Sequence, residues 1–178
     1  VVGITASGGA PYVLAAVEEA RRRGAATIGV VTNPGTKLAA LCDVCIAPEV
    51  GPEVIAGSTR LKSGTAQKLV LNMLTTCTMV KLGKVYGNLM VDLNPSNQKL
   101  MERARRIICQ VAGVGENRAD EALAEAQGST KLAIMMLKSG LSRGEAARLL
   151  ESSGGVLRRA LGALEAHRKV LSGQTACQ

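Results

Sequence analysis

Residues 51–68 of the chain read GPEVIAGSTRLKSGTAQK and lead directly into an apolar run with helical spacing. Hydroxyl groups and three cations, Arg60, Lys62 and Lys68, are concentrated in this stretch. Such donors suit an anion, because the first-turn N–H groups of a helix lack intrahelical partners and the helix dipole adds to their field. Glu53 stands beside them and could move a proton. The alternative is a solvated, capped loop between two elements.

Three short apolar segments upstream of this stretch predict a parallel sheet. The expected strands cover residues 1–5, 26–32 and 43–47, and helices are expected over residues 12–23 and 36–41. The order strand–helix–strand predicts parallel pairing through right-handed crossovers. Ligands of such sheets gather at the carboxyl ends of the strands. We therefore expect the glycine-rich loop after the first strand and the 51–68 stretch to meet at one edge.

The predicted ligand site combines these two segments. Its substrate-binding candidates are Ser7, Gly8, Gly9, Ser58, Thr59, Arg60 and Lys62, and its catalytic candidate is Glu53. Thr32 and Asn33 follow the second strand and belong to the same edge. For Ser7 the alternative is ordinary turn chemistry. We expect no metal, because Cys42-Asp-Val-Cys45 has neither a second cysteine pair nor paired histidines to complete a zinc site.

The downstream half of the chain predicts helices. A helix over residues 65–82 carries apolar residues on two faces, which suits burial against both the sheet and another subunit. Polar Asn88 and Asp92 interrupt the apolar run that follows and could face a cleft. The break at Asn94-Pro-Ser predicts a domain boundary, with residues 1–94 forming the α/β domain and residues 95–178 a second module.

That second module is expected to contain helices and no strands. An amphipathic helix over residues 97–112 comes first, then three short helices capped by Asn117, Ser129 and Ser142, then a last helix over residues 156–171. The fold class is therefore α/β: a partial parallel sheet flanked by helices, followed by a small helical module.

Composition narrows the range of partners. The 178 residues are 47% hydrophobic, which is enough for a core, and carry a net charge of +8. We do not expect nucleic acid as a partner, because the charge lies in helical segments without a recognised binding motif. No signal peptide or transmembrane run is evident. Five cysteines, an odd number, are typical of reduced thiols in a cytoplasmic protein.

The quoted stretch resembles the signature of the bacterial N-acetylmuramic acid 6-phosphate etherases and of their vertebrate relative, the glucokinase regulatory protein. The pentapeptide Gly64-Thr-Ala-Gln-Lys followed by LVLNML is nearer to the etherases. The runs Gly83-Lys-Val-Tyr-Gly-Asn-Leu-Met-Val-Asp and Ile4-Thr-Ala-Ser-Gly are similar to that family as well. The similarity extends over nearly the whole chain, including C-terminal helices that resemble the family's ubiquitin-associated-like module.

This resemblance implies a sugar isomerase (SIS) domain that binds phosphorylated amino sugars and forms a homodimer, without a metal or an organic cofactor. The implied reaction is a lyase reaction of cell-wall recycling in the cytoplasm. It cleaves the D-lactyl ether of N-acetylmuramic acid 6-phosphate and yields N-acetylglucosamine 6-phosphate and D-lactate. Glu53 aligns with a glutamate at the ligand site of related SIS domains.

One departure from the family affects the expected activity. Etherases carry a glycine-rich GAGTSGR-type loop and two catalytic glutamates in DASE-type and EDS-type stretches, and none of these occurs here. We therefore expect this chain to be the C-terminal part of an etherase and to be inactive, or nearly so, alone. Two alternatives are a non-catalytic sugar-phosphate-binding regulator like the glucokinase regulatory protein, and a DNA-binding regulator with an SIS domain.

Overall fold

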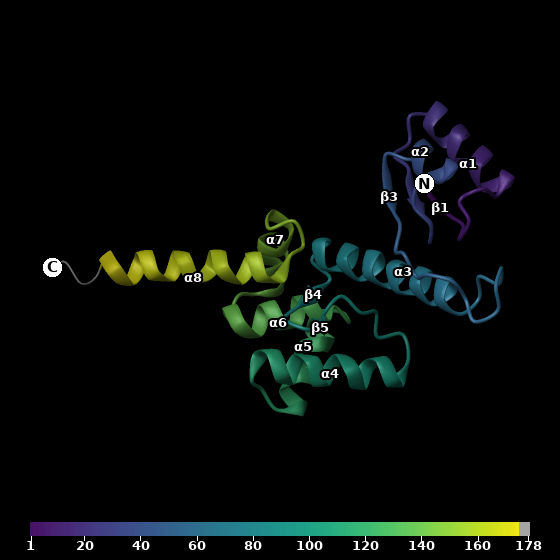
Figure 1. Ribbon diagram of the computed structural model, residues 1–178. Coiled ribbons are helices and arrows are strands. Elements are labelled where there is room, and N and C mark those ends of the chain that lie inside the picture. The colour runs from purple at the N-terminus through teal and green to yellow at the C-terminus, as the bar shows by residue number, and fades with distance from the viewer. Residues whose placement is uncertain (175–178) are drawn as a thin grey trace. The chain divides into compact units, whose positions relative to one another are not determined.

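A computed structural model describes the backbone of residues 1–174 and the side chains of residues 1–166 (Figure 1). The chain divides into two compact units, residues 1–77 and residues 78–178, which are described separately below. The division falls ahead of the predicted boundary between residues 94 and 95. The reason is that Val91 and Leu93, which precede the Asn94-Pro-Ser break, are buried in the core of the second unit.

The first unit is built on a three-stranded parallel sheet. Its strands are β1 (Val2–Ile4), β2 (Ile28–Val30) and β3 (Val44–Ile46), arranged in the order β1-β2-β3. Gly3 of β1 pairs with Gly29 of β2, which in turn pairs with Cys45 of β3. Every predicted strand is present, although each is shorter than its apolar run, and the predicted parallel pairing is confirmed.

Two helices connect these strands, α1 (Pro11–Arg22) and α2 (Lys37–Leu41). Val17, Val31 and Leu38 form the small core between helices and sheet. Gly3 permits this close packing, because a Cβ at that position would lie 2.8 Å from Val17 Cγ2 and 3.3 Å from Leu38 Cδ1. At the amino end of the sheet, the Asp43 carboxylate accepts hydrogen bonds from the Thr27 N–H at 2.8 Å and the Thr27 hydroxyl at 2.9 Å.

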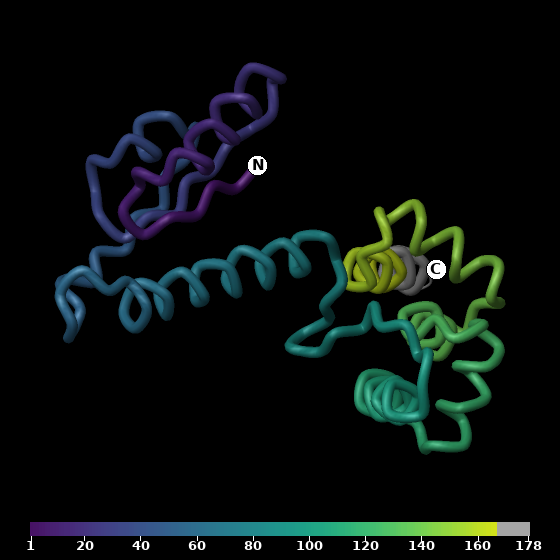
Figure 2. Tube along the Cα trace, turned by 90° about the vertical axis from the view of Figure 1, so that its right-hand side faces the viewer, coloured from purple at the N-terminus to yellow at the C-terminus, as the bar shows by residue number. Residues whose placement is uncertain are grey.

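Helix α3 (Lys62–Lys81) begins within the 51–68 stretch and is one uninterrupted helix (Figure 2). It begins three residues ahead of the predicted start at residue 65. Only Ser63 and Val70 are buried along it. The predicted apolar stripe is therefore mostly exposed in this single chain, and Leu69, Met73 and Val80 are each more than half exposed.

The second unit begins with an antiparallel hairpin, β4 (Val85–Tyr86) and β5 (Leu89–Met90), where the sequence had given no clear prediction. Helices make up the rest of its described part. They are α4 (Gln98–Ala112), α5 (Glu116–Glu125), α6 (Thr130–Ser139), α7 (Arg143–Ser152) and α8 (Leu157–Gln174). Ile108, Ile134, Met135 and Leu157 are fully buried in one continuous core. The predicted helical module is thus confirmed.

The helix caps agree with the sequence at two of three predicted positions. Ser129 caps α6 by accepting a hydrogen bond from the Leu132 N–H, and Ser142 forms a complete capping box with Glu145 on α7. The prediction that Asn117 caps α5 was wrong, because the helix begins at Glu116 with Gly115 as its N-cap. Asp120 of α5 pairs with Arg105 of α4, with 2.7 Å between Asp120 Oδ1 and Arg105 Nε.

Within the described residues, no helix is both long and apolar enough to cross a membrane.

Candidate functional site

The carboxyl edge of the sheet in the first unit is joined to the start of α3 by one buried hydroxyl. Thr32, which follows β2, donates its hydroxyl hydrogen to the Ala6 carbonyl at 3.2 Å. Its Oγ1 also lies 3.1 Å from Ser63 Oγ in the first turn of α3. A threonine hydroxyl has one hydrogen, so Ser63 is the donor in the second contact. The loop after β1, the end of β2 and the first turn of α3 therefore meet at this edge, as the sequence predicted.

Glu53 occupies the N-terminus of α3. Its carboxylate accepts hydrogen bonds from the N–H groups of Lys62 at 3.0 Å and Ser63 at 3.1 Å. These are two of the unpaired first-turn donors that the sequence had suggested for an external anion. The hydrogen bond from Lys62 is the main cause that lowers the pKa of Glu53, since it favours the charged form. Glu53 is thus an ionised capping carboxylate in this conformation.

The loop after β1 has a shape that requires glycine at one position. Gly8 adopts a left-handed conformation with φ of 68°, and a Cβ on it would lie 2.2 Å from Thr36 Cβ. Its carbonyl accepts a hydrogen bond from the Leu38 N–H of α2 at 3.1 Å. Gly9 is different, because it is exposed and has nothing within 4 Å of the position of a Cβ. Ser7 is exposed beside them, so the loop presents one hydroxyl at the sheet edge.

The remaining candidates follow Glu53 in the loop that leads to α3 and at the first residue of that helix, Lys62. Thr59, Arg60 and Lys62 are exposed, and Ser58 is half-buried. In the part of the chain that the structure describes, no hydrogen bond or ion pair involves the side chain of any of these four residues. Their hydroxyl, guanidinium and ammonium groups are therefore available to a ligand.

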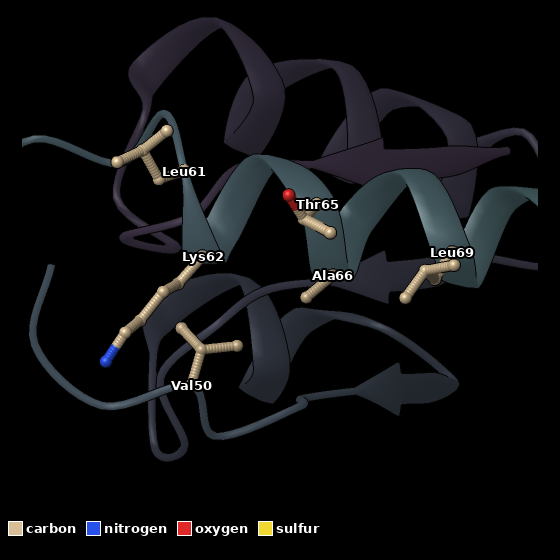
Figure 3. Close-up of a pocket in the computed structure, with 6 residues that line it drawn as sticks. All are labelled: Val50, Leu61, Lys62, Thr65, Ala66 and Leu69. Carbon is tan, nitrogen blue, oxygen red and sulfur yellow. The ribbon is translucent and has the colours of Figure 1, made fainter.

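A hollow of about 540 Å³ lies beside the first turns of α3 (Figure 3). Val50 and Leu61 from the loop and Thr65, Ala66 and Leu69 from the helix line it together with Lys62. Its walls are mainly apolar, and Lys62 supplies its one charged lining group among the described residues. The hollow can take the carbon body of a ligand while Lys62 pairs with an anionic group.

Sequence reasoning found the segments of the site but missed how they are connected. Thr32 was placed at the correct edge by its position after a strand, yet its link to Ser63 spans thirty-one residues and leaves no local pattern. The capping role of Glu53 was also missed. A carboxylate that caps a helix from nine residues upstream lies outside the usual capping spacing, so only the folded loop reveals it.

Two family models match parts of this chain. The first is the SIS domain, which matches residues 1–77, the residues of the first unit. The second is the C-terminal lid domain of glucokinase regulatory protein, which matches residues 87–133 in the second unit. Together they agree with the division into a sheet unit and a helical unit.

Curated relatives with the name N-acetylmuramic acid 6-phosphate etherase are similar to most of this chain. A protein from Symbiobacterium thermophilum is 60% identical over 141 residues, which cover 79% of this chain and 47% of that protein. One from Streptomyces avermitilis is 53% identical over 163 residues, 92% of this chain and 52% of the relative. One from Deinococcus radiodurans is 50% identical over 165 residues, 93% of this chain and 54% of the relative. The chain spans about half the length of these relatives.

Proposed function

Because this chain is related to the N-acetylmuramic acid 6-phosphate etherases over most of its own length, we propose that it acts as part of a carbon–oxygen lyase. The lyase cleaves the D-lactyl ether of N-acetylmuramic acid 6-phosphate and gives N-acetylglucosamine 6-phosphate and D-lactate. Identity of 50% or more to proteins with that name is the observation that carries the proposal. Their names favour it over a non-catalytic regulator like the glucokinase regulatory protein. We place the reaction in cytoplasmic peptidoglycan recycling.

The sheet edge supplies groups that suit a phosphorylated sugar. Ser7 and the amide of Gly9 can donate to phosphate oxygens, and Ser58 and Thr59 can bind phosphate or sugar hydroxyls. Arg60 and Lys62 add positive charge, and neither side chain forms an ion pair with a carboxylate of the described residues. The phosphate lies away from the reacting ether, so its binding energy can position the sugar for the reaction.

The chemistry needs a base and an acid. The proton next to the C1 carbonyl of the open-chain sugar is removed, and the departing lactate oxygen is protonated. Water then adds to the double bond that the elimination leaves, which gives N-acetylglucosamine 6-phosphate. A catalytic role for Glu53 stays a prediction. Its carboxylate would have to accept that proton with oxygens that already accept two amide hydrogen bonds, and its lowered pKa makes it a weaker base.

We further propose that the chain alone has little or no activity. Glu53 is the only carboxylate among the predicted site residues, whereas the elimination uses two proton-transfer groups. The experiment incubates the purified chain and, in parallel, a full-length etherase from Streptomyces avermitilis with N-acetylmuramic acid 6-phosphate, and measures D-lactate. Release by the full-length relative alone is the expected result. Release by the chain at the relative's rate would contradict the inactivity but support the lyase assignment.

Homodimerisation is also a proposal, and the exposed apolar residues of α3 support it. Leu69 and Met73 are four residues apart on one face, and they are 51% and 59% exposed. Apolar surface of this kind is usually covered by a partner. A Leu69→Asp variant should sediment as a monomer at concentrations at which the unaltered chain is dimeric, while Tyr12→Asp, at another exposed position, should not change the oligomeric state.

A further inference from the structure

The second unit holds a cationic hollow that the proposed reaction does not use. It has a volume of about 250 Å³ and lies between the β4–β5 hairpin and α4. Asn88, Leu89 and Met90 of the hairpin form one side. Four residues of α4 form the other, and no carboxylate lines the hollow. Its polar side chains therefore carry guanidinium and amide groups, and none of them is negatively charged.

The α4 side is a continuous stripe of the helix. Arg103, Arg106, Ile107 and Gln110 stand three, four and seven positions apart, which places them on one face. Arg105 lies on a different face and is neutralised by α5, with its Nε 2.7 Å from Asp120 and its Nη1 3.8 Å from Glu116. Arg103 and Arg106 have no such partner, since no hydrogen bond or ion pair joins their side chains to another described residue.

Two guanidinium groups without counter-charges in one hollow are complementary to an anion. Each guanidinium can bind two oxygens of a phosphate or carboxylate in a planar, bidentate geometry. The amides of Asn88 and Gln110 can donate to remaining oxygens or hydroxyls. Leu89, Met90 and the buried Ile107 provide apolar contact for the carbon part of a ligand.

We propose that this hollow is a binding site for a small organic oxyanion, either a phosphate ester or a carboxylate. All of its lining residues belong to the second unit, so the proposal stands independently of the reaction assigned above. Asn88, which the sequence suggested could face a cleft, lies in its lining.

The experiment titrates the ¹⁵N-labelled chain with inorganic phosphate and, separately, with D-lactate at constant ionic strength. Saturable shifts are expected for the amides of residues 88–90 and 103–110. Arg103→Gln and Arg106→Gln should each weaken binding about tenfold, because each removes a charge-assisted contact. The matched control is Arg158→Gln, which removes the same charge from an exposed position on α8 and should leave the affinity unchanged.

The outcomes separate the possibilities. Shifts with phosphate alone assign the site to phosphate esters, and shifts with D-lactate alone assign it to carboxylates. The absence of saturable shifts with both probes would overturn the proposal, as would an equal loss in Arg158→Gln, which would indicate general charge attraction. A spectrum that is otherwise retained in Arg103→Gln and Arg106→Gln excludes unfolding as the cause. Arg60→Ala should leave these shifts intact even where it abolishes sugar-phosphate binding at the sheet edge.

Discussion

Thr32 Oγ1 and Ser63 Oγ lie 3.1 Å apart in a buried position, although thirty-one residues separate them in the chain. This contact attaches the first turn of α3 to the carboxyl edge of the sheet. The Thr32 hydroxyl bonds the Ala6 carbonyl as well, so one side chain connects three segments of the candidate site.

Replacing Thr32 with valine should lower the free energy of opening of the first unit. The variant keeps the shape of the side chain but leaves the buried Ser63 hydroxyl without its partner and removes one of the hydrogen bonds to the Ala6 carbonyl, which costs about 1–3 kcal/mol for a buried group. Hydrogen exchange of the β2 amides measures the change in the free energy of opening. Thr75→Val is the control, because the exposed Thr75 hydroxyl bonds only carbonyls of its own helix. Equal effects of the two variants would argue against a connecting role for Thr32.

Gly8→Ala should destabilise the first unit much more than Gly9→Ala. At Gly8 a Cβ would overlap Thr36, whose Oγ1 caps α2, and the left-handed backbone adds about 1–2 kcal/mol of strain. Gly9 has open space and no positive φ. Thermal unfolding followed by circular dichroism compares the pair. Similar melting temperatures for both variants would show that the loop can move away from Thr36.

Acid should weaken the attachment of residues 53–61 to α3. The pKa of Glu53 is lowered in the folded chain, mainly by the hydrogen bond from the Lys62 N–H. A lowered pKa adds stability above the pKa of the unfolded state, about 4.3, and this stability is lost as pH falls through the folded value. Hydrogen exchange of the Lys62 and Ser63 amides, measured between pH 6 and pH 3 as protection factors, should therefore show weaker protection at low pH.

Glu53→Gln should already lack that extra protection at neutral pH and show a flatter pH profile. Glu49→Gln, an exposed neighbouring glutamate, serves as the control and should retain the full profile. An unchanged profile in Glu53→Gln would place the acid-sensitive group elsewhere.

Asp92 should make the stability of the second unit sensitive to acid as well. It lies 3.0 Å from Lys84 Nζ and 3.6 Å from Lys131 Nζ. Partial burial raises its pKa, but the hydrogen bond from Lys84 and the charge of Lys131 outweigh that effect and lower it overall. The stabilisation is therefore present above the unfolded pKa and is lost as pH falls through the folded value.

Because the Asp92 side chain is 40% exposed, Asp92→Asn should cost at most about 1 kcal/mol. Urea denaturation at pH 7 and pH 3 should show a larger difference at pH 7 than at pH 3. Glu165→Gln, at an exposed position on α8, is the control and should have no effect at either pH. A loss of equal size at pH 3 and pH 7 would contradict the ion-pair explanation.

Arg60→Ala should weaken phosphosugar binding in a full-length protein that carries this segment. The exposed guanidinium can make a charge-assisted contact to phosphate, and its loss should reduce affinity about tenfold. Isothermal calorimetry with N-acetylglucosamine 6-phosphate measures it, with Arg158→Ala as the control. Unchanged affinity would place Arg60 outside the site.

Local patterns predicted most of the fold. Apolar runs separated by glycine-rich turns predicted the parallel strands. The Ser129 and Ser142 caps were predicted from their positions just ahead of helical patterns. The Asn117 cap was wrong because α5 begins one residue earlier, at Glu116, with Gly115 as its N-cap. The predicted start of α3 was three residues too late, because the folded loop brings the Glu53 carboxylate to the Lys62 N–H. Hydrogen bonds between side chains of distant segments produce no periodic pattern in the sequence. Such hydrogen bonds hold the candidate site together, so its connections could not be predicted.

The capping of α3 by Glu53 makes ligand entry an exchange reaction. A phosphate that bound the Lys62 and Ser63 amides would have to displace the Glu53 carboxylate, which accepts hydrogen bonds from both. Binding of phosphate at the helix would then release the 53–61 loop. The fraction of bound ligand and the fraction of released loop would therefore rise together.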